Sequence, residues 1–516
     1  MKTLSVENGD ESPAPVPPDE SPAPEPSDAA AASRSRSLTI LKNASIITFS
    51  SIILKLINFI YGVAIVRQLG VAGYGQFATV VNFVGLFAIF AELGVSQYVM
   101  REISRWPEKS DKLFWNLVFI RLSLALMGVV GITLAAMAYG YPSDLVGGVA
   151  LYTLTFVWAA IQAPVETLLA ANEKFSYATS MAVVGQLSTI TLGSIVLYND
   201  WGFIALIAVG LVAMVPPTLL GIWGIRRHRL LRRSLIVTPR EWPLLIRRGL
   251  PFGFISLSLT IGFTVDSVML SRYESAEVVG WYNAAYNLAR SLLFFFSGIS
   301  FAMVPTLSRA YLTDVGLVQR WYFRSVKVML FIGLPIAVGG TIVALPLFLF
   351  LYGEQYLPAA SVFQIIVWDV PLLLFTSFCG NMATVIGAER MAARIYFTAA
   401  IVNVLGNLLL IPIFGMYGAA TATLLTDFAA ATQFYWVLGH KLKLPNMAPV
   451  ALRVVFACTV MTVSLMGLKA LGATLWVLIL VGVVVYMTVA ALTNLIDAEE
   501  RRMLALVLAK VKPART

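Results

Sequence analysis

Three basic residues, Lys55, Arg121 and Arg290, lie inside long apolar segments of the sequence. A charge at the centre of a membrane helix costs on the order of 3 kcal/mol, so each is expected to face a cavity, to pair or to snorkel. Arginine would bind the oxygens of an anion in bidentate fashion, and lysine would bind them as a point charge. We therefore predict Lys55, Arg290 and Arg121 as substrate-binding residues. Arg121 ranks last because its long side chain could snorkel to the cytoplasmic surface.

Three aspartates, Asp266, Asp369 and Asp427, also lie inside apolar segments. A buried carboxylate can take up a proton, as a proton-coupled carrier requires, whereas an arginine partner would keep it ionised. We take these aspartates as candidates for coupling to an ion. For them and for the basic residues the alternative is a structural ion pair that holds helices together, and the sequence does not decide between the two roles.

The sequence contains no pattern typical of catalysis or metal binding. Its two cysteines, Cys379 and Cys458, lie in apolar segments, and its two histidines, His228 and His440, lie in polar connectors. External connectors are about ten residues or shorter, and the cytoplasmic ones lack a glycine-rich loop with lysine that would cradle phosphate. We therefore predict no catalytic residue, no metal ion and no cofactor.

The composition is that of a polytopic, all-α integral membrane protein. Of 516 residues, 59% are apolar and only 12% are charged, which excludes an ordinary soluble enzyme. The net charge of +10 follows the predicted membrane topology, so it does not indicate nucleic-acid binding. We count about fourteen segments, each long enough to cross a hydrocarbon core of about 30 Å: 43–67, 75–99, 113–139, 145–171, 178–198, 202–225, 250–271, 279–304, 326–352, 359–386, 391–414, 417–438, 450–468 and 473–494.

The basic residues predict the orientation of these segments. On the side that holds the N-terminus lie 31 of the 37 lysines and arginines, which places both termini in the cytoplasm. Proline-rich, acidic residues at the start predict a disordered tail. The resulting organisation is a cytoplasmic tail (1–42), an N-lobe of helices 1–6 (43–225), a basic cytoplasmic linker (226–249), a C-lobe of helices 7–12 (250–438), helices 13 and 14 (439–494) and a second cytoplasmic tail (495–516).

A short pattern that occurs twice supports the two lobes. Gly75 follows Arg67 by eight residues and Gly280 follows Arg272 by eight, with an offset of 205 residues between the copies. Each arginine ends a helix that leaves the cytoplasm and each glycine opens the next, so the copies have the same orientation. Two parallel six-helix repeats plus two C-terminal helices are the simplest account.

Several motifs together resemble a known family. They are Arg67-Gln-Leu-Gly70, Val265–Leu270 with Val279–Ala285, Pro305–Arg309 and Asn403–Thr423. Their order and spacing resemble the oligosaccharide and O-antigen flippases of the polysaccharide biosynthesis family, in the multidrug/oligosaccharidyl-lipid/polysaccharide exporter superfamily. The positions of substrate-contacting residues vary between members, so the candidates above rest on their depth in the membrane.

The resemblance implies two helical bundles in a V shape that translocate a polyprenyl-diphosphate-linked oligosaccharide from the cytoplasmic to the outer leaflet by alternating access. It implies a place in the inner or plasma membrane and in polysaccharide or lipopolysaccharide biosynthesis. The expected partners are the lipid-linked oligosaccharide and membrane lipids, not nucleic acid. Coupling to H+ or Na+ and contacts with a glycan polymerase or other assembly proteins remain open.

Three alternatives remain. Two have the same fold, a cation-coupled drug exporter and a flippase for the peptidoglycan precursor. The third, with less support, is a membrane glycan polymerase or ligase, which would need a water-exposed active site for which the short external connectors leave little room.

Overall fold

The computed structural model describes residues 26–231, 235–295, 307–442 and 446–495. By its internal contacts the chain divides into Met1–Leu54 and Lys55–Thr516, and the site described below lies in the second unit. The first helix begins at Pro26, so residues 26–42, which the sequence analysis places in a disordered tail, are helical. Residues 1–25 of that tail and 496–516 of the C-terminal tail lie outside the described residues.

The regular structure of the described residues is helical throughout. A further short helical stretch covers residues 307–313. The α-helices are α1 (Pro26–Phe87), α2 (Val95–Arg105), α3 (Ser110–Ala138), α4 (Ser143–Ala171), α5 (Phe175–Tyr198), α6 (Gly202–Val212), α7 (Val215–His228), α8 (Trp242–Tyr273), α9 (Ala276–Ser291), α11 (Val315–Tyr352), α12 (Leu357–Ile366), α13 (Asp369–Val385), α14 (Glu389–Leu442), α15 (Ala448–Ala470) and α16 (Leu475–Leu492). The 3-10 helices are η1 (Ala88–Ala91), η2 (Pro107–Lys109), η3 (Pro239–Glu241), η4 (Leu292–Phe295) and η5 (Glu354–Tyr356).

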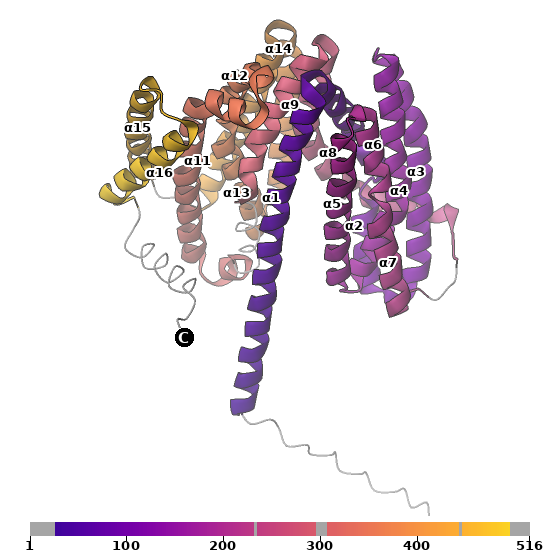
Figure 1. The fold of residues 1–516 in the computed structure, drawn as a ribbon. Coiled ribbons are helices and arrows are strands. Elements are labelled where there is room, and N and C mark those ends of the chain that lie inside the picture. The colour runs from indigo at the N-terminus through magenta and orange to yellow at the C-terminus, as the bar shows by residue number, and fades with distance from the viewer. Residues whose placement is uncertain (1–25, 232–234, 296–306, 443–445, 496–516) are drawn as a thin grey trace, which may run out of the picture. The chain divides into compact units, whose positions relative to one another are not determined.

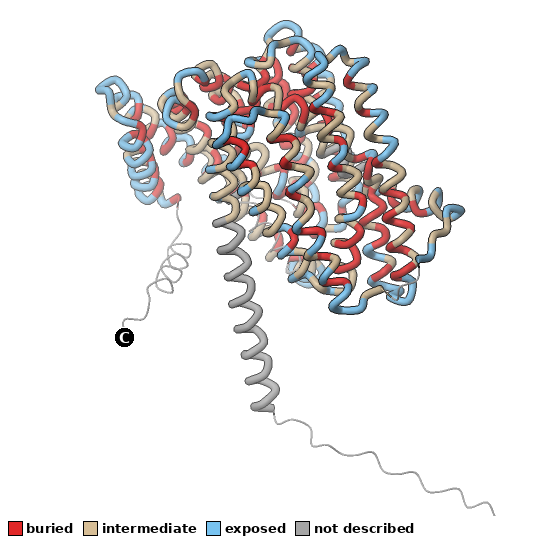
Figure 2. The backbone as a smooth tube through the Cα atoms, turned by 45° about the vertical axis from the view of Figure 1, so that its right-hand side comes forward, coloured by how far each residue is buried: buried red, intermediate tan, exposed pale blue. Residues whose placement is uncertain are grey.

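Many of these helices suit a membrane. Within the described residues nine helical spans are long and apolar enough to cross one, or ten if the bent pair Glu354–Ile366 and Asp369–Val385 is a single span. Large apolar side chains such as Met127, Ile413 and Val463 remain about 70% exposed, which hydrocarbon tolerates and water does not. Figure 2 shows exposed residues, in pale blue, along helices as well as in the connectors. The all-α membrane fold is therefore confirmed, whereas the count of fourteen and the two six-helix lobes remain predictions.

Two predicted helix boundaries are kinks inside longer helices. α1 bends at Gly70 (φ 65°, ψ 179°) and α14 bends at Gly415 (φ 53°, ψ −130°). Glycine adopts these backbone angles at little cost because it has no Cβ atom. The expected breaks at 67–75 and at 414–417 are thus present as bends, so each of these two helices includes parts of two predicted segments and counts as one span.

The two copies of the repeated pattern touch each other. A Cβ atom on Gly75 would overlap the carbonyl oxygen of Ala276, and one on Gly280 would overlap that of Val71. Val71 and Ala276 are 205 residues apart, as Gly75 and Gly280 are. Each copy of the pattern therefore contributes one glycine and one carbonyl group to the contact. Such reciprocity is typical of segments related by a two-fold axis. We call this the glycine contact; it holds the segment after the α1 kink against α9.

The glycine contact predicts a sharp difference between two substitutions. Gly75→Ala should destabilise the protein by about 1–3 kcal/mol, since the new methyl group forces the two backbones apart. Gly131→Ala, whose Cβ would meet no atom within 4 Å, should show no loss of stability. Thermal unfolding of both purified variants in detergent measures the difference, and equal unfolding temperatures would show that the close approach does not exist.

Four helices enclose the interior polar groups. α14 packs against α8 and α13, and α8 packs against α9. α15 and α16 pack against each other and against α11, away from that group (Figure 1). The largest apolar core contains residues of α1, α8, α9, α11, α12, α13 and α14. Tyr282, Tyr356 and Phe348 are fully buried in it. The core thereby fixes α8, α9, α13 and α14 around the site.

Candidate functional site

Asp266 of α8 is completely buried and is held by three donors. Its Oδ1 accepts from the Ser267 backbone N–H at 2.9 Å, and its Oδ2 accepts from the Tyr282 hydroxyl and from the Thr423 hydroxyl at 3.4 Å. The donors come from α8, α9 and α14, so one carboxylate ties three helices together. Charge-assisted bonds of this kind compensate the cost of burying a carboxylate.

A second acidic centre is the pair Asp369 of α13 and Asp427 of α14. Their side chains lie close enough to interact strongly with each other. Asp369 is 4% exposed, and its Oδ1 has no hydrogen-bond partner among the described residues. Two adjacent carboxylates in a buried site repel unless a proton or a cation lies between them. The pair therefore has the chemistry of a site for H+ or a small cation.

Arg290 of α9 is a positively charged residue near both acidic centres, and it lines the same cavity as Asp427. Its positive charge acts on Asp266, Asp369 and Asp427. The guanidinium carbon lies 3.7 Å from the centre of the Phe263 ring and 4.5 Å from that of Tyr286. Stacking on aromatic faces stabilises a guanidinium without consuming its N–H donors.

A cavity of about 100 Å³ opens beside these groups. Arg290 and Asp427 line it together with Asn403, which is 1% exposed and whose Nδ2 has no partner among the described residues. The volume accommodates a few water molecules or a small ion. Its other lining residues are Gly262, Phe263, Leu373, Thr376, Ser377, Tyr396, Ala399, Ala400, Thr423 and Thr426.

A polar contact connects this site with α1. Asn82 of α1 donates to the Oδ1 of Asn283 at 3.0 Å, and the Ser267 hydroxyl donates to the same oxygen at 3.0 Å. Ser267 and Asn283 are the chain neighbours of Asp266 and Tyr282 respectively. The surroundings of Asp266 are therefore connected to the helix that forms the glycine contact.

The structure unites four of the six predicted site residues and places the other two elsewhere. Arg121 of α3 is 6% exposed; its Nη1 donates to the Ser96 hydroxyl at 2.9 Å and lies 3.7 Å from a Glu92 carboxylate oxygen. Arg121 is therefore buried and does not extend toward the surface, because Ser96 and Glu92 contact its guanidinium within the protein. Lys55 is half-buried on α1 and is not among the residues that line the cavity.

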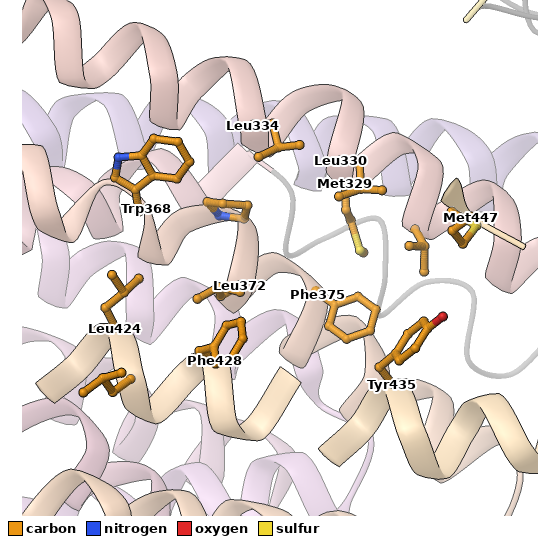
Figure 3. A pocket seen from close by; sticks show the side chains of 13 residues that line it. Met329, Leu330, Leu334, Trp368, Leu372, Phe375, Leu424, Phe428, Tyr435 and Met447 are labelled. Carbon is orange, nitrogen blue, oxygen red and sulfur yellow. The ribbon is translucent and has the colours of Figure 1, made fainter. Parts of the chain in front are cut away.

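A larger apolar groove lies on other faces of the helices that carry the acidic pair. It has a volume of about 680 Å³ and runs between α11, α13 and α14. Figure 3 shows Leu372 and Phe375 of α13 and Leu424 and Phe428 of α14 lining it. The intervening residues of the same helices, among them Leu373 and Asp427, line the polar cavity.

Comparison with known proteins decides the family. Residues 40–311, more than half of the chain, match the family described as polysaccharide biosynthesis protein. The chain belongs to the polysaccharide biosynthesis protein family. Residues 251–409 also match the MatE family. The resemblance to the polysaccharide biosynthesis family that the motifs indicate is thus confirmed.

Individual relatives are distant but extensive. The chain is 23% identical over 383 residues to the probable flippase AglR of Haloferax volcanii, covering 72% of this chain and 77% of that protein. It is 23% identical over 400 residues to the uncharacterised membrane protein MJ1068 of Methanocaldococcus jannaschii, covering 72% and 78%.

Solved structures show the same fold. The lipid II flippase MurJ in its inward closed conformation matches with a TM-score of 0.68 at 14% identity, covering 87% of this chain and 98% of that one. An inward-facing multidrug resistance MATE transporter matches with a TM-score of 0.60 at 18% identity, covering 74% and 95%.

Several residues of the site in this family member were missed by the sequence analysis. Thr423, Thr426 and Asn403 are neutral, and neutral polar residues are common in membrane helices, so their depth alone does not mark them. One signal was present: Thr423 stands four residues before Asp427, which places both on one face of α14.

Proposed function

We propose that the protein is a cation-coupled flippase that moves a polyprenyl-diphosphate-linked oligosaccharide from the cytoplasmic to the outer leaflet of the cell membrane, for the synthesis of a surface polysaccharide or lipopolysaccharide. Both termini are cytoplasmic in this proposal, as the distribution of basic residues predicts. AglR of Haloferax volcanii, which this chain resembles over 77% of its length, is a probable flippase, and this supports the proposal.

One observation carries the proposal: a charged polar cavity and an apolar groove are built on different faces of α13 and α14. A lipid-linked sugar has the same two parts, a charged polar head and a long hydrocarbon chain. A groove of about 680 Å³ in a membrane-spanning region would hold a stretch of isoprenoid, because only hydrocarbon can fill it without cost. The polar cavity is too small for an oligosaccharide, so the headgroup would occupy a cleft that opens when the helices move.

The charged residues have separate roles in this proposal. Lys55, deep in its apolar segment, is proposed to bind the diphosphate, and Arg121 is the second candidate once its contact with Glu92 loosens. Asp266 and the Asp369–Asp427 pair form the ion site, which takes H+ or Na+. Arg290, placed among all three carboxylates, belongs to the ion site as well as to the predicted substrate-binding set.

Alternating access follows from the contacts around Asp266. Ion binding there would shift Tyr282 and Ser267, and through Asn283 and Asn82 it would reach the glycine contact between α1 and α9. A ligand that binds one conformation better shifts the population toward it. Opening and closing of the glycine contact would then expose the cleft to opposite sides of the membrane.

The test is lipid selectivity in vesicles that contain the purified protein. A fluorescent polyprenyl-diphosphate sugar should cross between leaflets at least tenfold faster than in protein-free vesicles, whereas a neutral polyprenyl-linked sugar should not. Lys55→Ala should lower the diphosphate rate at least tenfold, and Lys109→Ala, an exposed lysine outside the apolar segments, should not. Equal rates for the two lipids would refute recognition of the diphosphate.

A cation-coupled drug exporter is the second candidate, favoured by the MatE match over residues 251–409, which contains Asp266 and Asp369. The two candidates differ in the cargo. Transport of cationic drugs, without movement of the diphosphate lipid in the same vesicles, would favour the exporter.

A further inference from the structure

Arg290 is a positively charged group that acts on all three carboxylates, those of Asp266, Asp369 and Asp427. No carboxylate oxygen in the described residues lies within 4.0 Å of it, so it is near both acidic centres without forming a closed ion pair with either. It thus compensates the cluster as a whole.

The guanidinium is also held in a way that leaves it free to move. The guanidinium lies over two aromatic rings, Phe263 and Tyr286, and its Nε is buried without a hydrogen-bond partner in the described residues. Stacking of this kind restricts the plane of the group but sets no fixed partner for its donors. The cavity beside it gives the side chain space in which to change partners.

The charge balance of the site shows why the position of Arg290 matters. With all groups ionised, three carboxylates and one guanidinium leave two negative charges in a buried site, which attract a cation or a proton strongly. The positive charge of Arg290 compensates one of the three carboxylates, so a bound cation has less negative charge left to compensate. Arg290 and a cation therefore act on the same carboxylates in opposition to each other.

We propose that Arg290 is a built-in competitor of the coupling cation, and that an anionic substrate relieves this competition by drawing the guanidinium away. The second half of this statement rests on the proposed function. Cation and diphosphate then favour each other's binding, and by linkage each raises the other's affinity by the same factor. The two bind together because one arginine cannot neutralise both sites at once.

The groups that face Arg290 define what must be controlled in a test. They are Asp266 and Phe263 on α8, Tyr282 and Tyr286 on α9, Asp369 on α13, and Asp427 and Tyr396 on α14. Arg227 of α7 provides a matched control, because it is also an arginine that lies over an aromatic ring, Trp223 at 5.4 Å from its centre, but it does not line the polar cavity.

The experiment measures Na+ binding to the full-length protein in nanodiscs by calorimetry, and proton uptake with a pH dye in weak buffer. Arg290→Gln should bind Na+, or retain protons, at least tenfold more tightly than the wild type, and Arg227→Gln should match the wild type. Millimolar inorganic pyrophosphate should tighten cation or proton binding to the wild type by at least threefold, and should have no effect on Arg290→Gln.

Each outcome decides the proposal. A folded Arg290→Gln that binds neither ion more tightly overturns it. If that variant does not fold, Arg290→Lys keeps the charge but lacks the bidentate fork, so a pyrophosphate effect as large as in the wild type would overturn the proposal and a smaller one would support it. If Arg290→Gln binds an ion more tightly but the wild type does not transport the lipid, competition between Arg290 and the cation is supported. The proposed function alone is then refuted.

Discussion

Asp427→Asn is expected to give a protein that still binds the diphosphate lipid but no longer accumulates it in one leaflet when an ion gradient is applied. Asparagine keeps the shape of aspartate but cannot take up a proton, and it gives a cation one charge fewer. Arg290 and the asparagine amide would then compensate the charge of the remaining Asp369 carboxylate. The affinity of the site for H+ or a cation would therefore fall. Asp369→Asn should behave in the same way because the two carboxyl groups act as a pair.

The measurement is the ratio of labelled lipid in the two leaflets of vesicles with an imposed H+ or Na+ gradient. In the two Asn variants the ratio should fall to about one, while Asp144→Asn, an exposed aspartate at the start of α4, should keep the wild-type ratio. If both variants still accumulate lipid against its gradient, the pair does not couple transport and is a structural feature of the α13–α14 contact.

Asp266→Ala is expected to cause the largest loss of stability. The substitution leaves the buried Tyr282 hydroxyl without its acceptor, at a cost of about 1–3 kcal/mol, and it also opens a cavity among α8, α9 and α14. Asp266→Asn keeps an oxygen for that hydroxyl and should lose less. Thermal unfolding in detergent, followed by circular dichroism, compares the variants.

A second substitution separates the hydrogen bond from the packing. Tyr282→Phe combined with Asp266→Ala removes both partners, so the double variant should be less destabilised than the sum of the two single variants. Strict additivity would mean that the Tyr282 hydroxyl does not depend on Asp266, and the tie between α8 and α9 would have to come from other contacts.

The buried charged cluster could be predicted from the sequence because a charge in an apolar segment has few acceptable environments. Asp266, Asp369, Asp427 and Arg290 were each identified by depth alone, and the structure brings the four together. Depth does not say which opposite charges meet, since partners come from helices far apart in the chain. The division into substrate and ion residues therefore needed the tertiary packing, which places Arg290 with the carboxylates.

Because depth does not show which opposite charges meet, the surroundings of Arg121 were not predicted either. Its position near a helix end suggested snorkelling, but Glu92 and Ser96 lie beside it in the folded protein and bind it there. The repeated glycines show the opposite case. Gly75 and Gly280 were noticed from spacing alone, and the structure adds that the two copies of the pattern touch each other.

The most direct test of the account is gradient-driven movement of a polyprenyl-diphosphate sugar by the wild-type protein in sealed vesicles. The lipid is expected to accumulate in one leaflet only when an H+ or Na+ gradient is present, and to return to an even distribution when an ionophore collapses the gradient. Rapid equilibration that is independent of any ion gradient would contradict coupling and indicate a scramblase. No movement of the lipid under either condition, in vesicles shown to contain folded protein, would contradict the proposed substrate.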